Sequence, residues 1–142
     1  MTPPRSRRDA GSITAFAMVM TAALVMCIGL VLDGGLVLAA RIRALGQAQE
    51  AARAGAQAID LTAYRQRGIV ILDPARAADA ARAYLTAAGL GDGQVQATGH
   101  EVTVTLTRTQ HLQILRIVGL GSITVHATGR ARPAHGITRE LR

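Results

Sequence analysis

The sequence predicts an α+β protein: one long N-terminal helix, then a small domain with one helix and a mainly antiparallel sheet of three or four strands. Two observations support this prediction. Residues 11–32 contain no charged residue, and a helical pattern continues from there to about residue 60. Beyond residue 60 the chain changes to short β-branched runs of alternating polarity, which are typical of strands. The length of 142 residues leaves room for one small domain beside the long helix.

The charge-free run at residues 11–32 predicts a transmembrane helix. At about 1.5 Å per residue it would span roughly 30 Å, the thickness of the hydrocarbon core of a bilayer. Arg5, Arg7 and Arg8 precede the run, and arginines near a membrane helix hold that end in the cytoplasm. We therefore expect a single-pass protein of a bacterial plasma membrane, with its N-terminus inside and everything after Asp33 outside.

Two other interpretations of the apolar run stay open. A buried core helix rarely runs this long without a charge. A cleaved secretory signal would release a soluble domain, and the residues from Val37 to Ala39 suit a signal peptidase. However, the apolar region of a signal is usually about 7–15 residues long, shorter than the run seen here.

The predicted segments follow one another along the chain. A basic cytoplasmic tail at 1–10 leads into the transmembrane helix at 11–32, an amphipathic helical stalk at 33–60, a small extracytoplasmic domain at 61–132, and a basic tail at 133–142. The stalk carries a small apolar stripe that would let a partner helix approach closely; the stripe consists of Leu38, Ile42, Leu45, Ala52 and Ala56.

Within the small domain the elements are predicted from local patterns. Asp73 and Pro74 are typical of a helix start, and Gly89 of a helix end. The expected order is a connector at 61–68, a strand at 69–72, a helix at 73–88, two paired strands at 94–98 and 101–109, a short helix or loop lying on the sheet at 110–121, and a last strand at 122–130.

Composition and spacing give no indication of catalysis. The four histidines are not at metal-ligand spacing, and Cys27 is the only cysteine. We expect no enzyme activity, no cofactor and no metal. The net charge is +7 and every basic residue is arginine, but these arginines are scattered, so nucleic-acid binding, as in a DNA-uptake pseudopilin, is a weaker alternative. We expect Asp33 to be exposed to headgroup water, or else paired with an arginine of a partner.

Several motifs in residues 7–60 resemble those of the Flp/Tad pilus assembly proteins, in particular TadE/TadG-like minor pilins of the short actinobacterial type. They are RRDAG ending at Gly11, Phe16-Ala17, VLDG at 31–34, Arg41, and the alanine-rich block at 51–56. The resemblance implies a minor pilin-like or assembly and anchoring subunit of a pilus or secretion apparatus. Its partners would be other pilin-like or Tad subunits, contacted through helix packing.

Two departures from the family pattern affect what the resemblance implies. Gly11 occupies the position of a prepilin-peptidase site, but no acid follows it until Asp33, whereas pilins carry a glutamate a few residues after the glycine. Gln49 stands where an acid precedes the alanine-rich block. We therefore expect Gly11 to stay uncleaved and the protein to be retained in the membrane.

Overall fold

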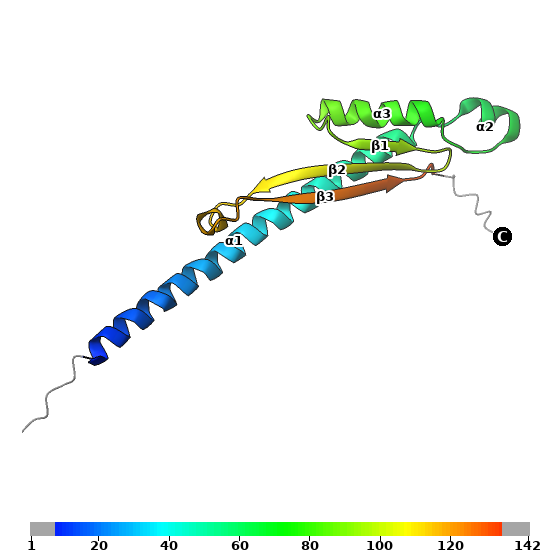
Figure 1. Cartoon of the computed structure of the whole chain (residues 1–142). Coiled ribbons are helices and arrows are strands. Elements are labelled where there is room, and N and C mark those ends of the chain that lie inside the picture. Colours follow the sequence, from blue (N-terminus) through cyan, green and yellow to red (C-terminus); the bar gives the residue numbers. More distant parts are fainter. Residues whose placement is uncertain (1–7, 135–142) are drawn as a thin grey trace, which may run out of the picture. The chain divides into compact units, whose positions relative to one another are not determined.

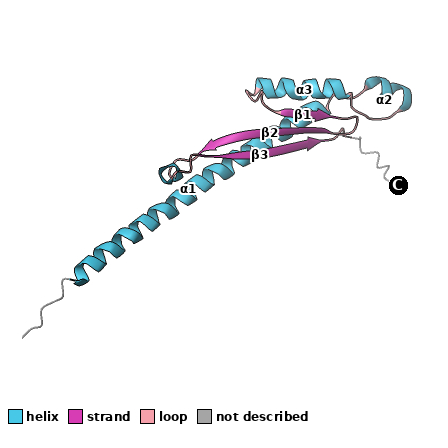
Figure 2. Ribbon diagram, viewed as in Figure 1, coloured by secondary structure: helices cyan, strands magenta, loops and turns pink. Residues whose placement is uncertain are grey.

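The computed structural model describes residues 8–134, with the side chains of residues 8–12 and 118 left out of the description. The elements in chain order are α1 (Arg8–Ala56), α2 (Leu61–Arg67), α3 (Pro74–Ala87), β1 (Gln94–Ala97), β2 (Val102–His111), the 3₁₀ helix η1 (Leu115–Val118) and β3 (Ser122–Ala131) (Figure 1). The strands form one antiparallel sheet in the order β1-β2-β3 (Figure 2). The predicted α+β class is confirmed.

The described residues form two compact units, and α1 contributes to both. The helix–loop unit consists of residues 8–38 and 110–123, and the sheet unit of residues 39–109 and 124–134.

The sheet unit has a core of small and medium side chains. Three alanines of α1 are fully buried in it: Ala48, Ala51 and Ala52. The others come mainly from α3 and β2, and are Leu72, Ala77, Ala81, Leu85, Leu90, Val102, Val104 and Leu106. Alanine on α1 permits close packing, and so does Gly55, since a Cβ there would lie 2.7 Å from the carbonyl oxygen of Ala77.

Several local predictions are confirmed in the sheet unit. The carboxylate of Asp73 accepts hydrogen bonds from the amides of Ala75 and Arg76, and so caps α3. The strands β1 and β2 pair as an antiparallel hairpin, with Val95 opposite Val104. The alternation along β2 places Val102, Val104 and Leu106 in the core.

The segment between α1 and α3 differs from the prediction. Residues 61–68 are not a connector, because Asp60 accepts hydrogen bonds from the amides of Thr62 and Ala63 and thereby starts α2. The long helix ends at Ala56, short of residue 60. The predicted strand at 69–72 is wrong, since only an isolated bridge joins Leu72 to Ile59. The small domain accordingly holds two α-helices where one was expected.

The connection between β2 and β3 also differs. The strand β2 runs on to His111, and the short helix expected in this region is η1. Three amides of this segment are bound by Asp33 of α1 within the helix–loop unit, and whether the segment also lies on the sheet stays a prediction. The last strand is close to its predicted range; Val125 and Ala127 are buried, while Ile123 is partly exposed.

A candidate anchoring site on the long helix

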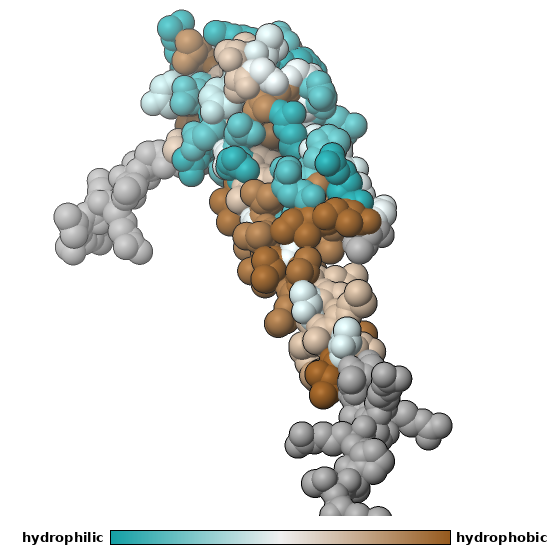
Figure 3. Space-filling model, turned by 90° about the vertical axis from the view of Figure 1, so that its left-hand side faces the viewer, coloured by the Kyte–Doolittle hydropathy of each residue, from teal (hydrophilic) through white to brown (hydrophobic). Residues whose placement is uncertain are grey.

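The first part of α1 exposes large apolar side chains on all its sides. From residue 13 to residue 32 every residue is exposed except Gly29, and hydrophobic surface is gathered there rather than scattered (Figure 3). A soluble helix buries one apolar stripe, whereas a helix that is apolar all round is typical of a membrane span. In the described part of the chain, one helical stretch is long and apolar enough to cross a membrane, Ile13–Ala56.

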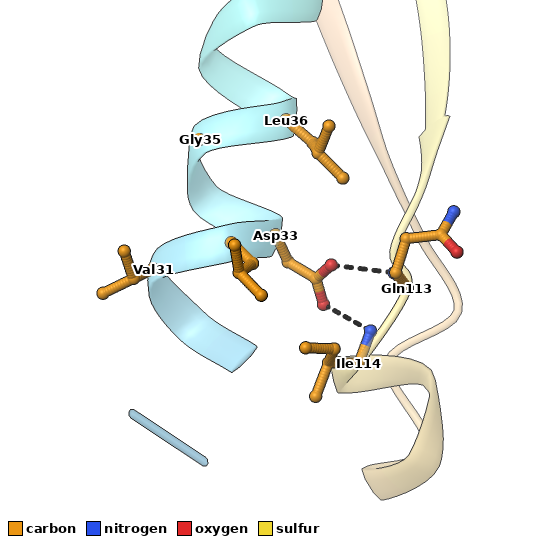
Figure 4. A pocket seen from close by; sticks show the side chains of 7 residues that line it. Val31, Asp33, Gly35, Leu36, Gln113 and Ile114 are labelled. Carbon is orange, nitrogen blue, oxygen red and sulfur yellow. Dashed lines mark hydrogen bonds between the residues drawn. The ribbon is translucent and has the colours of Figure 1, made fainter. Parts of the chain in front are cut away.

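Asp33 is the exception to this exposed surface, because it is fully buried. One carboxylate oxygen accepts a hydrogen bond from the amide of Gln113 at 2.8 Å. The other accepts from the amide of Ile114 at 2.9 Å, and Figure 4 shows these two bonds. The same oxygen also accepts from the amide of Leu115 at 2.7 Å. A carboxylate with three amide donors can remain charged without exposure to water.

The three amides are available because they stand at the start of η1. The first amides of a helix have no acceptor within that helix, and a side-chain oxygen usually supplies one. Ile114, which occupies the cap position of η1, has no oxygen in its side chain to do so. Asp33 takes this role from 80 residues away in the sequence, and so fixes the segment from Gln113 to Leu115 to α1.

Gly29 lies one helical turn before Asp33 on the same face of α1. A Cβ at this glycine would lie 2.6 Å from Cγ2 of Ile114, so the absence of a side chain is what admits the isoleucine. Beside this contact is an open groove of about 360 Å³, lined by Val31, Leu32, Asp33, Gly35, Leu36, Gln113 and Ile114. The polar contact and the steric contact together fix the loop to α1.

This arrangement corrects the expectation that Asp33 is exposed to headgroup water, because its side chain is buried and bound by backbone amides of the same chain. The sequence gives one signal, the aliphatic-Asp-Gly pattern at residues 31–34, which marks the position. The pattern does not reveal the partners, because backbone amides have no residue type by which they could be recognised.

A second polar contact of α1 lies in the sheet unit. The side-chain amide of Gln49 donates to the carbonyl oxygen of Arg130 at 2.8 Å, and its own oxygen accepts from the amide of Arg130 at 3.3 Å. Gln49 thereby provides hydrogen-bond partners for both backbone groups of Arg130 on β3, which is an edge strand of the sheet. A carboxylate could accept but not donate here, which gives a physical reason for glutamine at a position where an acid was expected.

The residues predicted to act at the membrane or in helix packing fall in different surroundings. Arg5 and Arg7 lie outside the described residues, while Arg8 begins α1 and Gly11 lies within it. Among the stalk residues the larger three are exposed, namely Leu38, Ile42 and Leu45. Ala52 is buried in the core of the sheet unit, and Ala56 is partly buried.

No group of three or more potential metal ligands occurs within residues 8–134. The histidine on β3, His126, is exposed and shares a hydrogen bond with the hydroxyl of Thr107 on β2 at 3.2 Å. Other polar side chains make caps on α2 and α3 and the two contacts of α1.

These features define a small α+β protein that carries a membrane-capable helix near its N-terminus. Residues 11–58 match the family model described as putative Flp pilus-assembly TadE/G-like. The match covers about a third of the chain, including most of α1, and confirms the resemblance for that segment. The similarity of residues 11–58 to the TadE/G-like family model supports involvement in Flp pilus assembly. Neither the curated proteins nor the solved structures gave a significant match.

Proposed function

We propose that the protein is a non-enzymatic, single-pass membrane subunit of a Flp/Tad, type IV-like pilus or secretion apparatus, acting as a minor pilin-like or anchoring component. The observation that carries the proposal is the coincidence of two ranges. The TadE/G-like match at 11–58 and the membrane-capable stretch Ile13–Ala56 are nearly the same part of the chain. The segment that defines the family is therefore also the segment with exposed apolar surface.

The partner contacts of this subunit would be made by side chains that its own fold leaves uncovered. Ile42 is 62% exposed and Leu45 is 49% exposed, although both are large and apolar. Ala48 and Ala52 of the same helix are covered by the sheet unit. The exposed aliphatic residues thus form the part of the predicted stripe that remains free for another pilin-like helix.

Thiol cross-linking in the native host tests this contact. In a Cys27→Ser background, Ile42→Cys should form a disulfide-linked or bismaleimide-linked species with another pilus subunit, identified by mass spectrometry. Arg43→Cys is the matched control, because it is exposed on the same helix about 100° away. Equal cross-linking at both positions, or none at Ile42→Cys, would argue against helix packing through this stripe.

The orientation can be tested separately. A reporter that is active only outside the cytoplasm, fused after Arg142, should be active, because the arginines before the span hold the N-terminus inside. The opposite result, with activity only for an N-terminal fusion, would reverse the proposed orientation.

Processing at Gly11 is a further part of the proposal. Cleavage would create an amine at Ser12 with no nearby carboxylate to neutralise it among apolar helices, so we propose that the chain keeps its N-terminal arginines. Intact-mass measurement of membrane-extracted protein should give a species that still contains residues 1–11. A dominant species starting at Ser12 would instead place the chain among processed pilins, and one starting after Ala39 would indicate a secreted domain.

DNA uptake remains the alternative function. It requires salt-dependent binding of DNA by the protein, since phosphate contacts release counterions. No feature of residues 8–134 gathers the arginines into a single site, so the membrane subunit is the better supported proposal.

A further inference from the structure

The loop between β2 and β3 has a composition unlike that of an ordinary surface turn. Six of its ten residues from 112 to 121 are leucine, isoleucine or valine. Leu112 is buried, but Ile117 is 83% exposed and Leu120 is 57% exposed. Connections between strands usually run over a wet surface and are polar, so these exposed aliphatic side chains require another explanation.

The position of the loop within the helix–loop unit supplies one. Its residues 113–115 are bound by Asp33, and Ile114 lies against Gly29, which belongs to the charge-free run at 11–32. The neighbouring helix residues Leu30, Val31 and Leu32 are themselves exposed and apolar. The loop therefore continues the apolar surface of α1 at the C-terminal end of the predicted span.

Seven of the ten backbone amides of the loop donate to acceptors within the helix–loop unit, and such internal pairing lowers the cost of placing irregular chain in a membrane. The amides of residues 113–115 donate to Asp33. The amide of Leu112 donates to the carbonyl oxygen of Gly121, and the amide of Ile117 to that of Ile114. The amide of Gly119 donates to the carbonyl oxygen of Arg116, and the amide of Leu120 to that of Leu115. Without the carboxylate, three amides would face hydrocarbon with no acceptor, at a large cost.

We propose that this loop, residues 112–121, is a second membrane-contacting element, which inserts Ile117 and Leu120 among the lipid acyl chains at the bilayer interface. The exposed guanidinium of Arg116, in the same short helix, would remain at the level of the lipid phosphates. Asp33 makes the insertion feasible by accepting the three amides. The proposal rests on the proposed membrane helix, and the occupant of the surface is lipid rather than a second protein chain.

Fluorescence of single tryptophans tests the proposal, because the chain contains no tryptophan. The full-length protein carrying Ile117→Trp is reconstituted in phosphatidylcholine vesicles, with or without bromine on the acyl chains. Leu24→Trp, in the middle of the predicted span, reports on the helix itself. Gln96→Trp, exposed on β1, is the water-facing control.

We expect Ile117→Trp to show blue-shifted emission and strong quenching by lipids brominated near the headgroup. Leu24→Trp should be quenched best by lipids brominated near the chain end, and Gln96→Trp should be unaffected. Leu120→Trp provides a second reporter, and adding Asp33→Ala to Ile117→Trp should reduce the quenching.

The outcomes separate this proposal from the proposed function. If Leu24→Trp is quenched but Ile117→Trp and Leu120→Trp emit as in water, the loop is not inserted and the membrane helix stands. Blue-shifted emission from the loop without quenching would mean that protein covers it, which also overturns the proposal. Absence of quenching at Leu24→Trp would overturn both the membrane helix and the loop insertion.

Discussion

The same helix is used in opposite ways in the two units of the molecule. In the helix–loop unit, α1 exposes its large apolar residues and covers a glycine and an aspartate, Gly29 and Asp33. In the sheet unit it buries alanines and Gly55, while the larger Ile42 and Leu45 are exposed. Size and burial are thus inverted relative to a soluble helix, where large apolar side chains are the buried ones.

The inversion indicates what surrounds each part of the helix. Small residues permit backbones to approach closely, and they are buried where strand and helix backbones contact α1. Large apolar residues are exposed where we propose lipid and partner helices as the neighbours. Burial within the chain therefore marks the intramolecular contacts of α1, and exposed aliphatic surface marks the proposed external ones.

The largest expected effect comes from breaking the close packing of the sheet unit. A Cβ at Gly129 of β3 would overlap the backbone of α1 at Ala48, and backbone cannot move aside as a side chain can. Gly129→Val should therefore destabilise the fold by about 3 kcal/mol or more, measured by thermal melting followed by circular dichroism in detergent.

The matched control for that change is Gly121→Val in the helix–loop unit, where the added side chain would meet open space. It should melt close to the unmodified protein. Similar melting of Gly129→Val and the unmodified protein would show that β3 does not pack against α1 as described.

The next effect is local to the helix–loop unit. Asp33→Ala removes the acceptor of three amides, each bond to a charged group being worth about 1.5–3 kcal/mol. We expect hydrogen exchange at Gln113, Ile114 and Leu115 to accelerate at least about tenfold, measured by NMR or mass spectrometry in detergent. The amide of Leu72, which donates to Gly99 in the sheet unit, should keep its exchange rate. Unchanged exchange rates at all three loop amides would contradict their hydrogen bonding to the carboxylate of Asp33.

A smaller effect is expected at the second polar contact of α1. Gln49→Glu keeps the acceptor for the amide of Arg130 but loses the donor to its carbonyl oxygen, so stability should fall by about 1–2 kcal/mol. Glu50→Gln, an exposed neighbour on the same helix, should change stability by less than about 0.5 kcal/mol. Chemical denaturation of both variants gives the comparison, and equal midpoints would exclude a role for the amide.

The smallest effect is a pH dependence in the sheet unit. The hydrogen bond from Arg132 to the carboxylate of Glu101, 3.0 Å long, holds the pKa of Glu101 below its ordinary value of 4.5. A lowered pKa in the folded state means that Glu101 stabilises the fold above its ordinary pKa, and that this contribution is lost as the pH falls through the folded pKa. Glu101→Gln should therefore reduce the drop in melting temperature on acidification from about pH 5 to about pH 3. An unchanged drop in melting temperature would show that Glu101 does not contribute to the loss of stability in acid.

The elements that could be predicted from the sequence are those specified by neighbouring residues. The alternation from Val102 to Leu106 determines which face of β2 is buried, and Asp73-Pro74 supplies its own cap, so both needed only local pattern. The start of α2 was missed although Asp60 caps it in the same way, because a seven-residue helix is too short to show periodicity.

The contacts that fix the candidate site could not be predicted in this way. Asp33 and Gln49 both bind backbone groups about 80 residues further along the chain. A backbone amide is the same at almost every residue, so the sequence around Gln113 or Arg130 carries no sign of its partner. The sequence indicates that a lone acid such as Asp33 at the end of an apolar run is unusual. It does not indicate which groups donate hydrogen bonds to that carboxylate.

The central claim is that the exposed apolar part of α1 lies in a bilayer and the sheet unit lies outside the cell. Cys27, exposed within the span and the only cysteine, provides a direct test. A membrane-impermeant maleimide added to intact cells should leave Cys27 unlabelled until the membrane is dissolved in SDS. In a Cys27→Ser background, Gln96→Cys on β1 should be labelled in the same intact cells. Labelling of Cys27 before the membrane is dissolved, or of Gln96→Cys only after lysis, would contradict the account.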